Sequence, residues 1–222
     1  MKNIVITGAN RGIGLEFTKK YSQTHHVYAL CRKASPELSQ LDNVTIIDGF
    51  DVGNLASIQA GIAKCPDHID ILINNAGILQ RTSLETLLDG DVAKINDQFQ
   101  INALAPLMVV AAAKTKLIKG SKIALITSRM GSIGDNGSGT NYGYRMSKAA
   151  LNAAGKSLAI DLRESEISVA ILHPGWVKTE MTNNSGLISP QEAAEGLINR
   201  ISELNLTNSG TFWHSNGEIL EW

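Results

Sequence analysis

Short apolar runs alternate with longer amphipathic segments along most of the chain. Seven runs are predicted strands because they are rich in β-branched and other apolar residues: Asn3–Thr7, His26–Cys31, Val44–Asp48, Ile69–Asn74, Lys122–Thr127, Ser168–His173 and Thr211–Trp213. Several lack polar alternation, which is typical of parallel strands buried on both faces. Helices are predicted between them, over Ile13–Ser22, Leu55–Lys64, Val92–Lys116, Tyr144–Glu164 and Pro190–Leu204.

Strand–helix alternation over the whole length predicts an α/β fold. We expect one doubly wound, Rossmann-like, NAD(P)-binding domain over residues 1–222, with a mostly or wholly parallel sheet of about seven strands flanked by helices. Two polar loops, 131–143 and 179–189, follow predicted strands. Ligands of open α/β sheets bind at the carboxyl ends of the strands, so the substrate site is expected there. Taken alone, either loop is more simply an ordinary surface loop.

Composition and charge exclude several other classes of protein. With 20 Lys and Arg against 21 Asp and Glu, the net charge of −1 gives no broad nucleic-acid footprint. A hydrophobic fraction of 43% excludes intrinsic disorder. The longest apolar stretch, Ala103–Ala113, is too short to cross a membrane, and the N-terminus does not resemble a signal peptide. A cytoplasmic protein with no membrane or nucleic-acid partner is predicted.

The cysteine and histidine residues indicate neither a disulfide scaffold nor a metal site. Cys31 and Cys65 are too few for such a scaffold, and free thiols in a reducing compartment are expected. The five histidines have no metal-ligand spacing. One of them, His173, ends a predicted strand, where a satisfied structural role is the favoured interpretation.

The first predicted strand leads into a glycine-rich turn. Three glycines lie between this strand and the first predicted helix, where glycine permits a close backbone approach to a diphosphate. The helix N-terminus adds free N–H groups and a positive dipole end. A dinucleotide cradle is predicted, and a tight turn without a ligand is the alternative. Its cofactor-binding residues would be Gly8, Asn10, Arg11, Gly12, Ile13 and Gly14.

The spacing of this turn is T-G-x-x-x-G-x-G rather than G-x-G-x-x-G, and it resembles that of the short-chain dehydrogenase/reductases of classical type. Further motifs of that family follow in order: Asp51-Val52, Asn74-Asn75-Ala76-Gly77, Asn102, Ser128, Tyr144-x-x-x-Lys148 and Pro174-Gly175. The resemblance covers essentially all of residues 1–222. It implies an oxidoreductase that uses a nicotinamide cofactor.

Three stretches and the tail are similar to one branch of this family, the sniffer-type carbonyl reductases and C-factor-like proteins. They are residues 128–133, 142–152, 173–179 and 210–222. The resemblance implies NADPH-dependent reduction of a carbonyl in a small molecule, with broad substrate tolerance. Little chain follows Thr179 to form a lid, so an open apolar pocket is expected, touched by Trp176 and Met181.

The end of the second predicted strand indicates which cofactor is preferred. A carboxylate at that place selects NAD(H), whereas arginine accommodates the 2′-phosphate of NADP(H). Cys31 occupies this place, no acidic residue lies between Glu16 and Glu37, and Arg32 follows. With Arg11 as a second cation, NADP(H) is predicted to be preferred and NAD(H) is not excluded. A solvated Arg32–Lys33 pair is the alternative.

The resemblance implies further cofactor contacts. Asp51 would accept a hydrogen bond from the adenine amino group with Val52 at the ring, although Asp51 is also a candidate helix N-cap. The backbone of Asn75, Ala76 and Gly77 would pass along the cofactor. The nicotinamide amide and the phosphates would meet Pro174, Gly175, Trp176, Val177 and Thr179.

Tyr144 and Lys148 are four residues apart, so they lie on one face of a helix. A nearby ammonium lowers the pKa of a phenol, which can then act as a general acid or base. In the family, Ser128 would hold the substrate oxygen, Asn102 would position a water that links Lys148 to solvent, and Tyr144 and Lys148 would also touch the cofactor. A Tyr-x-x-x-Lys pair alone is more simply a surface helix pair.

One feature departs from the family pattern. The stretch between Ser128 and Tyr144 is longer than usual, with the extra residues at 134–140. This loop would reshape the mouth of the substrate pocket, and a displaced Ser128 would lose its contact with the substrate oxygen.

A carbonyl reductase is therefore the favoured function. Two alternatives stay open: an NADP-linked alcohol dehydrogenase working oxidatively, and a cofactor-binding regulator or signalling protein with little turnover. Alanine-rich faces on the helices around Asn102 and Tyr144 predict a homodimer, with a monomer or tetramer as alternatives.

Overall fold

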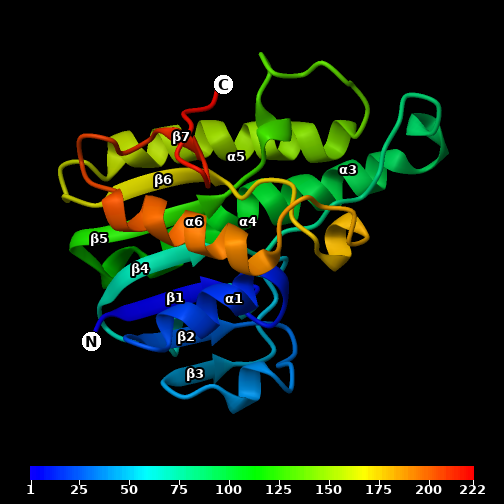
Figure 1. The fold of residues 1–222 in the computed structure, drawn as a ribbon. Helices are drawn as coiled ribbons and strands as arrows, with labels where there is room; N and C mark the ends of the chain where they lie inside the picture. The colour runs from blue at the N-terminus through cyan, green and yellow to red at the C-terminus, as the bar shows by residue number, and fades with distance from the viewer.

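The computed structural model describes residues 1–222 and contains one sheet of seven parallel strands (Figure 1). The strands are β1 (Asn3–Thr7), β2 (His26–Leu30), β3 (Val44–Ile47), β4 (Ile69–Asn74), β5 (Leu117–Ile126), β6 (Ser168–His173) and β7 (Phe212–His214). Their order is β3-β2-β1-β4-β5-β6-β7, so the winding reverses between β1 and β4. A reversal of this kind opens a ligand crevice at the carboxyl ends of the strands.

Six α-helices accompany the sheet: α1 (Gly12–Tyr21), α2 (Leu55–Ala63), α3 (Asp91–Phe99), α4 (Ala105–Ala113), α5 (Tyr142–Asp161) and α6 (Pro190–Glu203). Helices α1 and α6 cover one face of the sheet, and α2, α4 and α5 cover the other (Figure 1). Short 3₁₀ turns lie at Leu38–Gln40, Leu87–Asp89, Lys114–Lys116, Arg129–Gly131 and Glu180–Thr182. None of the helices combines the length and the apolar run required to cross a bilayer.

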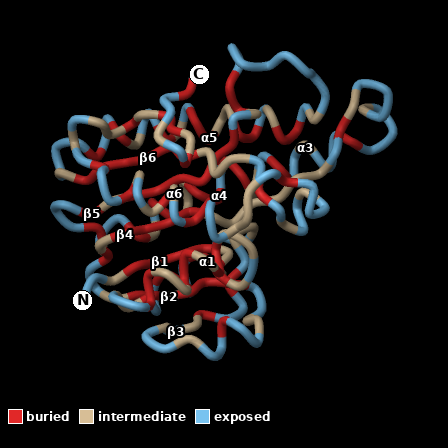
Figure 2. The backbone as a smooth tube through the Cα atoms, viewed as in Figure 1, coloured by how far each residue is buried: buried red, intermediate tan, exposed pale blue.

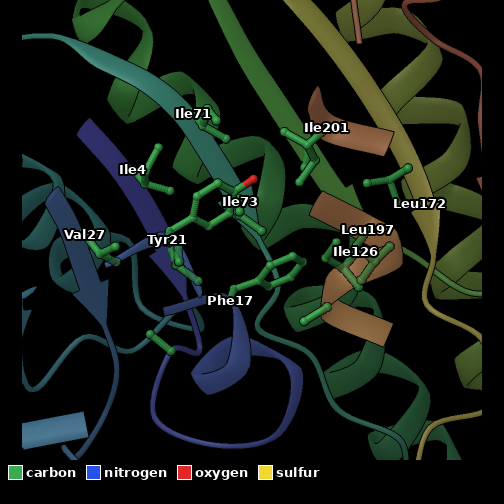
Figure 3. Close-up of a cluster of buried hydrophobic side chains, with 14 of the residues drawn as sticks. Ile4, Phe17, Tyr21, Val27, Ile71, Ile73, Ile126, Leu172, Leu197 and Ile201 are labelled. Carbon is green, nitrogen blue, oxygen red and sulfur yellow. The ribbon is translucent and has the colours of Figure 1, made fainter. Parts of the chain in front are cut away.

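Two hydrophobic cores, one on each face, explain the continuously apolar strands. In β1, Ile4 and Ile6 point into the core under α1 and α6, whereas Val5 points into the core on the opposite face. Phe17 of α1 and Ile201 of α6 fill the first core (Figure 3), and the buried residues follow the strands in Figure 2. Burial of each such side chain contributes about 1.5–3 kcal/mol, so this interior holds the strand ends at fixed positions.

The predicted helix over Val92–Lys116 is divided in the structure. Helix α3 ends at Phe99, the π-helical segment Gln100–Leu104 follows, and α4 begins at Ala105. Pro106 has no N–H to continue the α-helical pattern, and the N–H of Ala105 donates to Gln100 five residues back. The single-turn π segment places Asn102 in the interior, and π segments of this kind are frequent at functional sites.

The remaining boundaries differ from the predictions by small amounts. Strands β2 and β3 end one residue earlier than predicted, β5 begins earlier at Leu117, and α5 begins at Tyr142 instead of Tyr144. The single α/β domain and its seven-stranded parallel sheet are confirmed.

Candidate active site

The turn between β1 and α1 forms a cradle beside the reversal in strand order. Gly8 and Gly12 have positive φ angles of 66° and 53°, a conformation that favours glycine. A Cβ on Gly14 would lie 2.1 Å from the carbonyl oxygen of Gly8, so only glycine lets α1 approach β1 this closely. No side chain caps the start of α1, which leaves its first N–H groups and positive dipole end available to a diphosphate.

A cavity of about 890 Å³ opens in front of this turn, within the usual size range of cofactor sites. Most of the predicted cofactor residues line it: Gly8, Asn10, Arg11, Gly12, Ile13, Arg32, Asp51, Val52, Asn75, Ala76, Gly77, Tyr144, Lys148, Pro174 and Thr179. Gly14 is instead buried between α1 and β1. Gly175, Trp176 and Val177 line a smaller cavity next to this one.

The end of β2 presents a cation without a neighbouring carboxylate partner. Arg32 is exposed, lines the large cavity and forms no ion pair. Cys31 is buried, and its burial, together with the charge of Asp48, raises the pKa of the thiol to about 11. The thiol is therefore neutral near pH 7. The side-chain amide of Asn10 donates to the Lys33 carbonyl at 2.9 Å, which ties the glycine turn to this segment.

The second predicted cation, Arg11, is already paired. Its guanidinium forms an ion pair with Glu180, which belongs to the 3₁₀ turn Glu180–Thr182 after β6. Both side chains are more than half exposed and both line the large cavity. The pair therefore bridges the cavity between the glycine turn and the segment that follows β6.

Asp51 faces the large cavity but does not cap α2. The N-cap is Asn54, whose side chain accepts from the Ser57 N–H at 3.0 Å, so the prediction of Asp51 as an alternative N-cap is wrong. Asp51 instead accepts from the Gly53 N–H at 2.9 Å, which holds its carboxylate at the cavity wall. An exposed oxygen lone pair remains for a donor such as an adenine amino group.

Asn75 joins the ends of β1 and β4. Its side-chain amide donates to the carbonyls of Thr7 and Gly8, each at 3.1 Å. The Thr7 hydroxyl in turn accepts from the N–H groups of Asn75 and Ala76. These four hydrogen bonds fix the floor of the cavity. The next residue, Gly77, has no side chain, and a Cβ at this position would crowd Asn102 Oδ1 at 3.1 Å.

Asn102 is fully buried and locks two segments together. Its Oδ1 accepts from the Ile78 N–H and its Nδ2 donates to the Ile78 carbonyl, both at 2.8 Å. Nδ2 also donates to Ser147 Oγ on α5 at 3.0 Å. The side chain lines neither cavity, so it acts on the site by positioning the segment after β4 against α5.

Tyr144 and Lys148 lie together on the buried face of α5. Lys148 Nζ lies 5.8 Å from the centroid of the Tyr144 ring and donates to the Ile126 carbonyl at 2.9 Å. Burial lowers the pKa of Lys148 to about 8. Burial raises the pKa of Tyr144 to about 12, although a hydrogen bond with Ser128 opposes this. Desolvation of the phenolate is the larger of these two effects, so the pKa of Tyr144 moves in the direction opposite to the one expected from a nearby ammonium.

The longer loop at 134–140 does not displace Ser128. Close packing fixes the end of β5 on α5: a Cβ on Gly131 would lie 2.7 Å from the backbone of Lys148, and Thr127 Oγ1 donates to Asn152 Oδ1 at 2.7 Å. Ser128 therefore stays beside Tyr144, and its Oγ accepts from the Met130 N–H at 3.2 Å. The extra residues project outward and are exposed.

A second cavity of about 450 Å³ adjoins the first, and Tyr144 lines both. Its wall includes Ser128 and the apolar side chains of Ile13, Leu79, Met130, Trp176 and Met181. Trp176 and Met181, which were expected to touch the substrate pocket, both line this cavity, and Trp176 is 53% exposed. The polar part of the wall includes Arg129, Asp135, Ser138 and Arg145.

His173 also reaches the smaller cavity. Its ring packs edge-on against His214 with centroids 4.9 Å apart. Its Nδ1 is buried without a hydrogen-bond partner, so the prediction of a satisfied structural role is wrong for this nitrogen. Burial, with a smaller effect from His214, lowers the pKa of His173 to about 3, so this ring is neutral near pH 7. The structure brings no group of three or more His, Cys, Asp or Glu side chains together as metal ligands.

Four residues of the cavity walls were not predicted as site residues: Arg129, Asp135, Arg145 and Glu180. The two arginines directly follow Ser128 and Tyr144, and that adjacency was a usable signal. The pairing of Glu180 with Arg11 had no local signal, because it joins residues 169 positions apart.

A parallel Rossmann-like sheet with a glycine cradle at its strand reversal is typical of dinucleotide-binding proteins. The chain belongs to the short-chain dehydrogenase/reductase family: a family model described as short chain dehydrogenase matches residues 2–187. Among its relatives, 1-hydroxy-2-glutathionyl-2-methyl-3-butene dehydrogenase of Rhodococcus sp. (strain AD45) is 34% identical over 100% of both chains. The C-signal protein of Myxococcus xanthus is 40% identical over 71% of this chain and 95% of its own.

Solved structures of carbonyl reductases have the same fold. The NADPH-bound carbonyl reductase from chicken fatty liver matches with a TM-score of 0.91 and 29% identity, over 100% of this chain and 99% of that chain. Carbonyl reductase Sniffer of D. melanogaster matches with a TM-score of 0.90 and 30% identity over 100% of both chains. The predicted resemblance to sniffer-type reductases and C-factor-like proteins is confirmed.

Proposed function

We propose that this protein is an NADPH-dependent carbonyl reductase that converts a ketone or aldehyde into an alcohol. The observation that carries the proposal is the position of Tyr144, which lines both cavities and has Lys148 and Ser128 beside it. One cavity contains the glycine cradle and the other an apolar wall. A cofactor and a small carbonyl compound at the carboxyl ends of the strands would meet at this phenol.

The residues of the larger cavity fit a dinucleotide phosphate. The uncapped start of α1 offers N–H groups to the diphosphate, and the unpaired Arg32 offers a bidentate donor to a 2′-phosphate. Cys31 stands where a carboxylate would select NAD(H), so NADP(H) is the preferred cofactor in this proposal, and NAD(H) is not excluded. The chicken relative bound to NADPH supports this preference. When bound, NADPH supplies the hydride that the carbonyl carbon accepts.

The chain's own residues supply the proton and hold the oxygen. The pKa of about 12 keeps the Tyr144 phenol protonated near pH 7, so it can protonate the alkoxide oxygen as that oxygen develops. Ser128 donates a second hydrogen bond to the same oxygen. The Lys148 ammonium then stabilises the tyrosinate, which recovers its proton from solvent. Asn102 keeps the segment after β4 docked on α5.

The test is oxidation of NADPH and of NADH with quinones, aldehydes, α-dicarbonyls and keto esters. Tyr144→Phe is the chemical control: we expect kcat to fall about 10²–10⁴-fold with NADPH affinity kept. Turnover that survives this substitution unchanged would contradict the assignment of the acid. If the wild-type protein does not bind NADPH, the cofactor assignment is contradicted as well.

Two other functions have support from particular relatives. The Rhodococcus relative is named as a dehydrogenase of a hydroxyl compound, which favours an NADP-linked alcohol dehydrogenase working oxidatively. The C-signal relative favours a cofactor-binding regulator or signalling protein with little turnover. Rates measured in both directions at one pH separate the first from a reductase. Tight NADPH binding with no turnover on any compound favours the second.

We also propose that two copies form a homodimer. Helix α5 exposes Tyr142, Met146 and Ile160, and Leu104 is exposed just before α4. Apolar patches of this kind favour association. Analytical ultracentrifugation at several protein concentrations measures the oligomeric state. A monomer or a tetramer would contradict the proposed homodimer. The cytoplasmic location stays a prediction from the sequence.

A further inference from the structure

Each of the two residues proposed to contact the substrate oxygen is followed in the chain by an arginine. Arg129 follows Ser128, Arg145 follows Tyr144, and all four line the smaller cavity. Both arginines therefore lie in the wall of the cavity in which the carbonyl would react. Neither arginine has a role in the proton transfer.

Arg129 is already bound to a carboxylate within the cavity wall. Its Nε forms an ion pair with Asp135, a residue of the exposed loop 134–140. The two side chains are 45% and 40% exposed. An ion pair this accessible to solvent is weak, so a carboxylate on a bound molecule can compete for the guanidinium. The tail residues Glu218 and Glu221 do not line the cavity, and their negative charges contribute to raising the pKa of Arg129.

Arg145 carries a charge that no carboxylate neutralises. Its Nε donates to the carbonyls of Gly139 and Thr140, and its Nη2 donates to Ser138 Oγ at 2.8 Å. Arg145 holds the loop in place through these hydrogen bonds. Because the acceptors are neutral, the positive charge of Arg145 stays uncompensated. Asp135 is the only acidic residue lining the cavity, against two arginines, and His173 is neutral near pH 7.

We propose that the smaller cavity is specific for carbonyl compounds that carry a carboxylate. The substrate carboxylate replaces Asp135 on Arg129 and forms a bidentate pair, and Arg145 adds a favourable positive potential. The apolar side chains of Met130, Trp176 and Met181 contact the hydrocarbon between the carboxylate and the carbonyl. This inference rests on the proposed reductase function, because it concerns the substrate of the same site.

The experiment compares an acid with its own methyl ester: 4-acetylbenzoate with methyl 4-acetylbenzoate, and 4-oxopentanoate with methyl 4-oxopentanoate. The readout is the ratio of kcat/KM for the acid to kcat/KM for the ester, with NADPH saturating. We expect the acids to be favoured, with a ratio that falls as ionic strength rises. Arg129→Met should lower the ratio about tenfold or more.

Two further variants make the test specific. Asp135→Asn removes the competing carboxylate, so it should raise the ratio, in the direction opposite to Arg129→Met. Arg163→Met removes the same charge from an exposed residue outside both cavities and should leave the ratio unchanged. Esters that react well with a ratio unaffected by Arg129→Met would overturn the inference and leave the reductase proposal intact.

A binding measurement separates failure of the inference from failure of the proposed function. If no pair is reduced, calorimetric titration of 4-acetylbenzoate into the protein saturated with NADP⁺ takes the place of kinetics. Binding that is lost in Arg129→Met supports carboxylate recognition even though the reductase proposal has failed. Equal binding by wild type and variant, or none by either, overturns the inference.

Discussion

Burial moves the pKa values of Tyr144 and Lys148 in opposite directions, to about 12 and about 8. Taking charge out of water disfavours the phenolate in one case and the ammonium in the other. Near pH 7 the phenol is therefore protonated and the lysine is still mostly charged. That combination is the one that carbonyl reduction needs, because Tyr144 must hold a proton and Lys148 must stabilise the anion left behind.

The pH dependence of reduction should follow Lys148. Its pKa is depressed, so the charge is present below about pH 8 and is lost as the pH rises through that value, whereas Tyr144 stays protonated to about 12. We expect kcat/KM, which reports on the free enzyme, to be level below pH 8 and to fall toward about tenfold per unit above it.

Lys148→Arg tests the assignment of this pH dependence. Arginine keeps its charge throughout the range, so any remaining activity should lose the decline above pH 8. A wild-type profile that stays flat from pH 7 to 9.5 would show that the charge of Lys148 does not control the rate.

The 3₁₀ turn after β6 and the π-helical segment after α3 each join separate segments around the site. The turn Glu180–Thr182 after β6 reaches the glycine turn through the Glu180–Arg11 ion pair. The π-helical segment Gln100–Leu104 turns Asn102 inward, where all three of its hydrogen bonds join neighbouring segments. Both elements act on the site from outside the reacting groups.

Glu180→Gln should tighten binding of NADPH by roughly two- to fivefold. The carboxylate competes with a cofactor phosphate for Arg11, and the ion pair is exposed, so the effect is small. The dissociation constant can be measured from NADPH fluorescence. Glu203→Gln, which removes an exposed carboxylate paired with Arg200, is the matched control. Unchanged or weaker binding in Glu180→Gln would argue against this competition.

Asn102→Ala should lower the free energy of unfolding by about 1–3 kcal/mol. The substitution leaves the partly buried N–H and carbonyl groups of Ile78 without their side-chain partner, and such groups are expensive to leave unpaired. Urea unfolding measures this change. Asn96→Ala, at an exposed position on α3, should stay within about 0.5 kcal/mol of wild type. Equal stability of the two variants would mean that water replaces the lost contacts.

At the scale of the whole molecule, two cores on opposite faces of one parallel sheet bring the strand ends to a common edge. The cofactor cavity is lined from the ends of β1, β2, β4 and β6 and from α5, so most of the sheet must be intact for the site to exist. Ligand binding and folding are therefore linked.

NADP⁺ at about 100 times its dissociation constant should stabilise the fold by about 2.7 kcal/mol. For a chain of this size that corresponds to a rise in Tm of about 5–10 °C. Differential scanning fluorimetry measures the shift. NAD⁺ at the same concentration should produce a smaller shift because it lacks the 2′-phosphate for Arg32. Equal shifts would contradict the predicted preference for NADP(H).

The amino-acid sequence by itself determined the class of fold and most of the proposed site. The side chains of Ile4, Val5 and Ile6 alternate between two cores, and that two-sided burial leaves an uninterrupted apolar run that predicts a parallel strand. The cradle glycines, Tyr144 and Lys148 have short-range spacings set by a turn or by one helix. Geometry of this kind depends only on residues that are close in the sequence, so the sequence predicts it.

Only the tertiary structure decided the features that depend on distant neighbours. The pairing of Arg11 with Glu180 and the inward turn of Asn102 join segments with no shared pattern. The direction of the Tyr144 pKa shift belongs with them, because it depends on how much water the packed interior excludes. Desolvation and long-range ion pairing arise when separate segments meet, and no window of the sequence contains that information.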